Sequence, residues 1–117
     1  MKKVLVSIAL MAVAFSTHVF ANSNYDVFYK LNDKSTFKSM VRYLQTDDSQ
    51  TNDLQYIFHL TEKKLKAAKG NAPELEKTLR FNLANVKAAL SPEQYRKYLI
   101  VLNLSIQNQE FTYFAEK

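Results

Sequence analysis

The sequence predicts an all-α protein, a small bundle of three to four helices that follows a cleaved signal peptide. The 117 residues include one glycine and two prolines, far below the average usage of about 7% and 5%, so tight turns are scarce. Apolar residues recur at the helical spacing i, i+3, i+4, i+7. Short polar segments with helix-capping residues separate these patterns. Together the three observations favour a few long helices over many short strands.

The N-terminus has the three parts of a signal peptide. Lys2 and Lys3 form a basic start, residues 4–15 form an apolar run, and residues 19–21 place tolerated side chains before a cleavage point, which is the order of a secretory leader. The apolar run is shorter than the roughly 20 residues that span a bilayer. We therefore expect residues 1–21 to be removed rather than kept as an anchor, and the protein to reach the periplasm or the extracellular medium.

The remaining chain divides into an N-terminal arm and one helical domain. Residues 22–32 contain several apolar positions without one clear period, so an extended arm and a short helical turn both stay open. Residues 33–117 have the size of one small domain. The first helix of this domain is indicated by one apolar face of about three turns. That face is formed by Phe37, Met40, Val41 and Leu44.

Three further helices are predicted, each with an apolar stripe. The second ends near Lys69, where Gly70 fits the left-handed residue that commonly ends a helix. The fourth begins at Ser91 and is expected to run to about Phe114. The stripes are Leu54, Ile57, Phe58, Thr61, Leu65 and Ala68 in the second helix, Leu79, Leu83, Val86 and Leu90 in the third, and Tyr95, Tyr98, Leu99, Leu102 and Ile106 in the fourth.

Capping residues mark where these helices begin. Ser91 stands three positions before Gln94, and Asp47 stands three positions before Gln50. Both pairs match the capping box, in which the first side chain accepts from a backbone N–H and the glutamine reaches back. Asn71 begins a looser third copy. We therefore predict a helix-capping motif made of Asp47, Gln50, Ser91 and Gln94.

The composition argues against catalysis and cofactors. The chain has no cysteine, and of its two histidines only His59 lies beyond the leader. A single glycine leaves no glycine-rich phosphate loop, and the serines lie at caps or in polar stretches, away from any nucleophile elbow. We therefore expect no enzymatic activity, no cofactor and no metal.

The charge is mildly basic and concentrated in the second predicted helix. Without Lys2 and Lys3, 14 basic residues remain against 11 acidic ones, a net charge of +3, whereas nucleic-acid binders usually carry denser basic stripes. The lysines, with neighbouring aromatic or basic side chains, predict a binding surface for acidic protein clients or anionic lipid headgroups. The simpler interpretation is that the lysines complement the helix macrodipole. The candidate surface residues are Tyr56, Lys63, Lys64, Lys66 and Arg96.

Two resemblances bear on function. Residues 90–94 (LSPEQ) resemble the LTxxQ motif of the Spy/CpxP family of periplasmic proteins, and residues 44–50 resemble a second copy in which Thr46 and Gln50 are one position too far apart. That resemblance implies ATP-independent binding of unfolded envelope proteins on a basic and apolar face. Residues 90–99 are also similar to a stretch in small exported helical proteins of unknown function from Bacteroidetes, and this second resemblance implies no activity.

The leading hypothesis is thus a non-enzymatic exported binding protein with a chaperone-like action on unfolded clients. The alternative is a structural or regulatory protein that docks on one dedicated envelope partner. The expected partners are proteins, including a second copy of this chain in a homodimer, and nucleic acid is not among them. No stable membrane insertion of the mature chain is expected.

Overall fold

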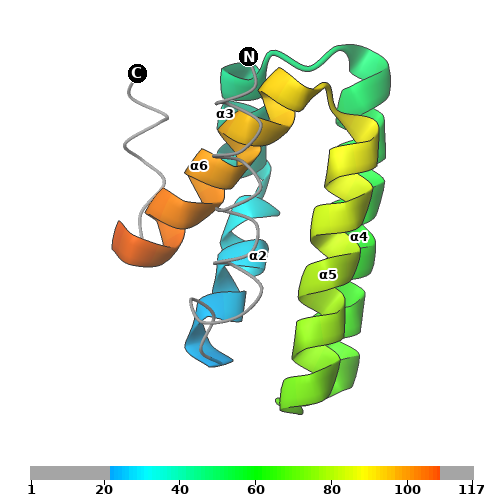
Figure 1. Cartoon of the computed structure of the whole chain (residues 1–117), viewed down its shortest axis with the longest axis vertical. Helices are drawn as coiled ribbons and strands as arrows, with labels where there is room; N and C mark the ends of the chain where they lie inside the picture. Colours follow the sequence, from blue (N-terminus) through cyan, green and yellow to red (C-terminus); the bar gives the residue numbers. More distant parts are fainter. Residues whose placement is uncertain (1–21, 109–117) are drawn as a thin grey trace.

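The computed structural model describes residues 22–108, and the side chains of residues 24–106. No strand occurs in this described part of the chain, which confirms the all-α class (Figure 1). The number of helices was predicted wrongly, because residues 22–108 contain five α-helices rather than three to four. The elements are η2 (Asn22–Tyr25, a 3-10 turn), α2 (Asp26–Leu31), α3 (Lys34–Leu44), α4 (Asp48–Ala68), α5 (Ala72–Ala89) and α6 (Pro92–Asn108).

The additional helix is α2. Of the two alternatives that the sequence left open for residues 22–32, the structure shows the helical one. Six residues are too few to display a full apolar period, and so short a helix is marginal in water by itself. Tertiary burial supports it here, since Phe28 and Leu31 are buried and the Phe28 ring meets the Phe58 ring of α4 edge-on at 6.4 Å between centroids.

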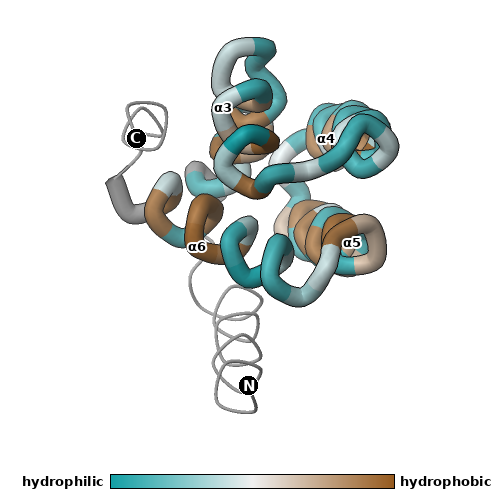
Figure 2. The backbone as a smooth tube through the Cα atoms, turned by 90° about the horizontal axis from the view of Figure 1, so that it is seen from above, coloured by the Kyte–Doolittle hydropathy of each residue, from teal (hydrophilic) through white to brown (hydrophobic). Residues whose placement is uncertain are grey.

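The helices form two groups around one core. α4 and α5 lie side by side as an antiparallel hairpin. α2, α3 and α6 pack together against one side of this hairpin (Figure 1). Viewed from above, apolar segments of α3, α5 and α6 turn toward the centre of the bundle (Figure 2). This arrangement leaves the outer faces of α4 and α5 to the surface, which matters for the candidate site.

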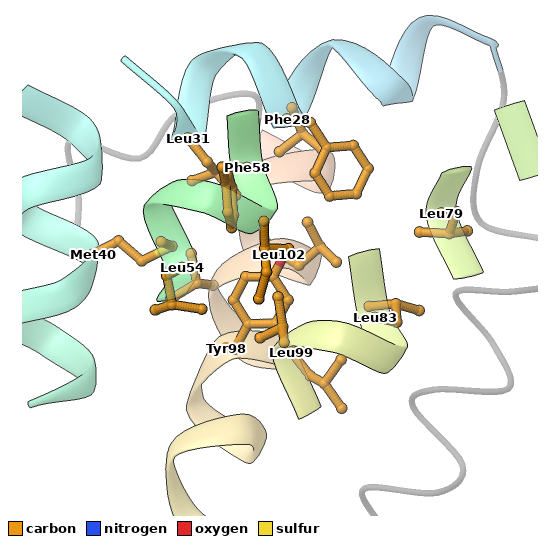
Figure 3. Packing of buried hydrophobic residues seen from close by; sticks show 14 of the residues in the cluster. Phe28, Leu31, Met40, Leu54, Phe58, Leu79, Leu83, Tyr98, Leu99 and Leu102 are labelled. Carbon is orange, nitrogen blue, oxygen red and sulfur yellow. The ribbon is translucent and has the colours of Figure 1, made fainter. Parts of the chain in front are cut away.

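Phe58 of α4 is central to the packing. Its ring contacts Phe28, Phe37 and Tyr98 edge-on, at 6.4, 5.9 and 6.2 Å between centroids, a geometry that aromatic pairs prefer. The surrounding residues are drawn from every α-helix, so the core joins the two groups. Figure 3 labels Phe58 and nine of them: Phe28, Leu31, Met40, Leu54, Leu79, Leu83, Tyr98, Leu99 and Leu102.

Left-handed residues end two of the helices. Gln45 ends α3 with φ 58°, its N–H donating to Arg42 at 3.2 Å. After α4, Gly70 has φ 78°, as expected from the sequence, and Lys69 before it also adopts a positive φ of 49°. A side chain in this conformation is held there at a cost, which glycine avoids. The predicted leader and the predicted helix end at Phe114 lie outside the described residues.

Candidate functional site

The predicted binding residues do not form one cluster. Tyr56, Lys63 and Lys66 are exposed on the outer side of α4, and Lys64 lies on the flank of that helix that faces α5. Arg96 is on α6, in the other group of helices (Figure 1). The Arg96 Nη2 pairs with Glu93 at 3.2 Å, while its buried Nε has no partner among the described residues. Four of the five residues are therefore presented by α4, and Arg96 is separate.

The free end of the α4–α5 hairpin carries a group of six basic residues. We call it the basic end and define it as Lys63, Lys64, Lys66, Lys69, Lys77 and Arg80. Three glutamates lie among these six cations and make the ion pairs Lys66–Glu62 at 3.9 Å, Lys77–Glu74 at 3.6 Å and Arg80–Glu76 at 2.9 Å. Each pair joins two residues of the same helix, and its side chains are largely exposed. Each pair therefore stabilises the fold by less than about 1 kcal/mol. The basic end keeps a net charge of +3.

Two lysines lie over aromatic rings. The Lys64 ammonium is 4.8 Å from the centroid of Phe81 on α5, and the Lys97 ammonium is 5.5 Å from that of Tyr43 on α3. Both rings are partly buried against the core. A cation over a ring face is attracted by the ring quadrupole, so a charge and an aromatic surface are offered together at each position.

Most other aromatic side chains are buried. Tyr25 of the N-terminal segment is 7% exposed, and Tyr95 and Tyr98 are also in the core. Within residues 24–106, Tyr56 is the one large hydrophobic side chain that is exposed, at 64%. The described surface therefore offers one aromatic anchor rather than a broad apolar area.

His59 is the one histidine among the described residues. It is exposed on α4, one turn from Tyr56, and no ion pair or hydrogen bond joins it to a carboxylate within the described part of the chain. Within residues 22–108, no group of three or more His, Cys, Asp or Glu side chains could hold a metal ion.

The predicted capping motif is present in both copies. Asp47 Oδ1 accepts from the Gln50 N–H at 2.7 Å, and Gln50 Oε1 accepts from the Asp47 N–H at 3.0 Å. Likewise Ser91 Oγ accepts from the Gln94 N–H at 3.1 Å, and Gln94 Oε1 accepts from the Ser91 N–H at 2.9 Å. The first copy is capped by Asp47 rather than Thr46, which explains the extra position in the sequence.

The two copies also bind each other, which the sequence did not reveal. Gln50 Nε2 donates to Gln94 Oε1 at 2.8 Å, and Gln94 Nε2 donates to Gln50 Oε1 at 3.1 Å. Each amide also reaches the end of a helix in the opposite turn: Gln50 donates to the Ala89 carbonyl at 3.3 Å, and Gln94 to the carbonyls of Leu44 and Gln45 at 3.3 and 3.2 Å. We call this arrangement the glutamine clasp. It joins the α3–α4 and α5–α6 turns and gives the LTxxQ-like residues a structural role.

A buried polar chain crosses the core, and the sequence did not reveal it either. Tyr98 Oη donates to Asn82 Oδ1 at 2.5 Å, Asn82 Nδ2 donates to Thr61 Oγ1 at 3.1 Å, and Thr61 Oγ1 donates to the Ile57 carbonyl at 2.7 Å. The chain links α6, α5 and α4. Its side chains are fully buried, so each bond offsets the cost of removing a polar group from water.

Burial also changes the acidity of tyrosines. The pKa of Tyr98 lies well above 10 because the ring is desolvated and Tyr95 lies close, although the hydrogen bond to Asn82 acts in the opposite direction. Desolvation likewise raises the pKa of Tyr95 and, helped by Glu76, that of Tyr25. These hydroxyls stay protonated at neutral pH, so Tyr98 serves as a hydrogen-bond donor in the core.

Comparison with known proteins adds no relative. No family model, no curated protein and no solved structure matches this chain. Among the described helices, none combines the length and apolar character needed to cross a bilayer.

Proposed function

We propose that this chain is a non-enzymatic, exported binding protein that docks on an acidic segment of one dedicated envelope protein through the basic end of its hairpin. The observation that carries the proposal is the net charge of +3 gathered at the free end of α4 and α5. Complementary charge raises the association rate and selects the partner more than it raises affinity. A rigid helical hairpin suits this use, because its cations need little ordering on binding.

The packing favours a dedicated partner over a broad range of unfolded clients. A holdase needs a contiguous apolar surface to cover exposed apolar segments of its client. In residues 24–106 the large aromatic side chains lie mostly in the core, with Tyr56 as the exposed exception. A mainly electrostatic surface without a contiguous apolar area fits a specific acidic site better.

A chaperone-like action is the second candidate, and the lysine-covered rings favour it. Phe81 and Tyr43 are only partly buried against the core, and the ammonium groups of Lys64 and Lys97 lie over their rings. Exposed lysine side chains change rotamer within nanoseconds, so a client could displace either ammonium and pack on the ring. This gives two small amphipathic contacts on opposite groups of helices.

One pair of assays separates the two candidates. Protein expressed from the full-length chain is titrated with a fluorescently labelled glutamate-rich peptide, and it is also added, without ATP, to a denatured client diluted from guanidinium while light scattering is followed. The test variant is Lys64→Glu/Lys69→Glu/Lys77→Glu. The matched control is Lys34→Glu/Lys38→Glu/Arg42→Glu, three exposed cations of α3.

The dedicated-partner proposal expects peptide binding that falls at least about tenfold, roughly 1.4 kcal/mol, in the test variant only, with no protection of the client. Suppressed scattering would support the chaperone-like candidate instead. A folded protein that neither binds the peptide nor protects the client would refute both. Equal loss in the test and control variants would show that net charge, not this surface, governs binding.

A further inference from the structure

The outer face of α4 has an exposed stripe that no other described helix covers. We define the α4 stripe as Asn52, Tyr56, His59 and Lys63, which are all exposed and follow one another at intervals of three or four residues. Such residues form one continuous ridge along a helix. Tyr56, 64% exposed, lies near the middle of α4. A single exposed tyrosine needs no explanation by itself, so the charges around it decide what the stripe can bind.

Those charges are arranged by sign along the helix. Asp48 and Asp53 lie in the first part of α4, and Lys63 and Lys66 lie in the last part, all exposed. Within the described residues, no ion pair involves Asp48, Asp53 or Lys63, and Lys66 meets Glu62 only at 3.9 Å. The helix dipole favours acidic residues in the first part of α4 and lysines in the last part. It does not provide a side chain of opposite charge for these exposed residues to contact.

We propose that the α4 stripe is a homodimer interface, in which α4 packs antiparallel against α4 of a second copy. A parallel pair would place acid beside acid and lysine beside lysine, whereas an antiparallel pair places each acidic part beside a basic part. In a twofold dimer the same patch is used by both copies. Every favourable contact therefore forms twice.

The helix geometry gives a register for this pair. With the twofold axis between positions 57 and 58, Asp48 is within one residue, about 1.5 Å of rise, of the second copy's Lys66. Along the helix axis, Asp53 has the same offset from the second copy's Lys63. Asp48 and Lys66 are also five full turns apart at 3.6 residues per turn, so both lie on the same flank of the helix. The two Tyr56 rings then lie next to each other beside the axis.

The contact is small, and this sets the expected affinity. One helix pair is at the low end of interface sizes, below about 1,200 Å², where associations are weak or transient. We expect a dissociation constant on the order of micromolar, stronger at low ionic strength because exposed charges are screened by salt. The dimer would use Lys63 and Lys66 of each basic end and leave Lys64, Lys69, Lys77 and Arg80 outside the interface. The two proposals therefore share two lysines, but they rest on different observations and are tested by different variants.

Sedimentation equilibrium of the full-length chain at low and high salt tests the dimer. Two charge variants are made, Asp48→Lys/Asp53→Lys and Lys63→Glu/Lys66→Glu, and circular dichroism checks that each is folded. Each variant alone brings like charges together across the interface and should be monomeric. An equimolar mixture pairs opposite charges at all four contacts and should form a heterodimer. Tyr56→Ala should weaken the wild-type dimer at least about fivefold, about 1 kcal/mol.

The control is Lys34→Glu/Lys38→Glu on α3, which should dimerise like the wild type. A wild-type chain that is monomeric at about 1 mM, a concentration that detects free energies near −4 kcal/mol, at low salt overturns the proposal. So does a wild-type dimer that both charge variants leave intact, because that result assigns the interface to another face. A mixture of the two variants that stays monomeric, while both are folded, also overturns it.

Discussion

Replacing Tyr98 by phenylalanine tests whether the buried polar chain stabilises the fold. The substitution keeps the ring that packs on Phe58 and removes the hydroxyl that donates to Asn82. Asn82 Oδ1 then stays buried with its donor gone. Removing the donor and leaving a buried acceptor unsatisfied costs about 1–3 kcal/mol. We therefore expect Tyr98→Phe to lower the free energy of unfolding by about 2 kcal/mol, and Tm by about 8–16 °C for a domain of this size.

Urea unfolding followed by circular dichroism measures this loss, and a double variant controls it. Tyr98→Phe/Asn82→Leu removes both partners, while the Thr61 hydroxyl keeps its bond to the Ile57 carbonyl. The double variant should be more stable than the sum of its single losses predicts, by about 1 kcal/mol or more. If Tyr98→Phe is within about 0.5 kcal/mol of wild type and the two losses simply add, the polar chain is not a source of stability.

The pH dependence gives an independent check. Burial raises the pKa of Tyr98 well above 10 in the folded protein, whereas in the unfolded chain the hydroxyl ionises near 10. The folded state keeps its proton where the unfolded state has released it, so stability is complete below pH 10 and falls as pH rises above it, by up to about 1.4 kcal/mol per pH unit. Tyr98→Phe should reduce this slope, and the rest should come from tyrosines such as Tyr95. An unchanged slope would contradict the assignment.

Three further substitutions probe other features. Gln94→Ala removes the glutamine clasp and the hydrogen bond from the Ser91 N–H to Gln94 Oε1, so it should cost about 2–3 kcal/mol in urea unfolding. Gln55→Ala, on the exposed side of α4, should cost less than about 0.5 kcal/mol, and equal costs would refute the clasp. Lys69→Gly relieves a left-handed side chain and should raise stability by about 0.5–1 kcal/mol by calorimetry, whereas Gln55→Gly should lower it by about 1 kcal/mol. Phe58→Ala should cost about 3–5 kcal/mol, and a loss below about 1 kcal/mol would show that the core has rearranged.

The long helices could be predicted because their signals are local. Capping residues and an apolar stripe are read within one or two turns, so the starts of α4, α5 and α6 at Asp48, Ala72 and Pro92 follow the expected caps. α2 was left open because six residues carry less than two turns of pattern, and its stability comes from contacts with other helices. Local patterns thus predicted the elements, but not the shortest one.

The interactions between helices could not be predicted in the same way. Asn82 looks like an ordinary polar position in a helix, and only the fold shows that it meets Tyr98 and Thr61. Gln50 and Gln94 were predicted as caps, but a cap uses only the amide oxygen. The second role of each glutamine depends on another turn 44 residues away in sequence. The candidate surface was also predicted residue by residue, which is why Arg96 was grouped with lysines that lie on a different helix.

The glutamine clasp has a chemical consequence for Gln50 and Gln94. At each position the side chain must accept a hydrogen bond from its own helix start and donate to the opposite turn. A carboxylate can accept but not donate, and an ammonium can donate but not accept, so only a primary amide of this length meets both demands. Deamidation of either glutamine would therefore leave the helix cap intact and break the link between the two turns. One added negative charge would thus keep the helix start at this end of the bundle and remove the tertiary contact between the two turns.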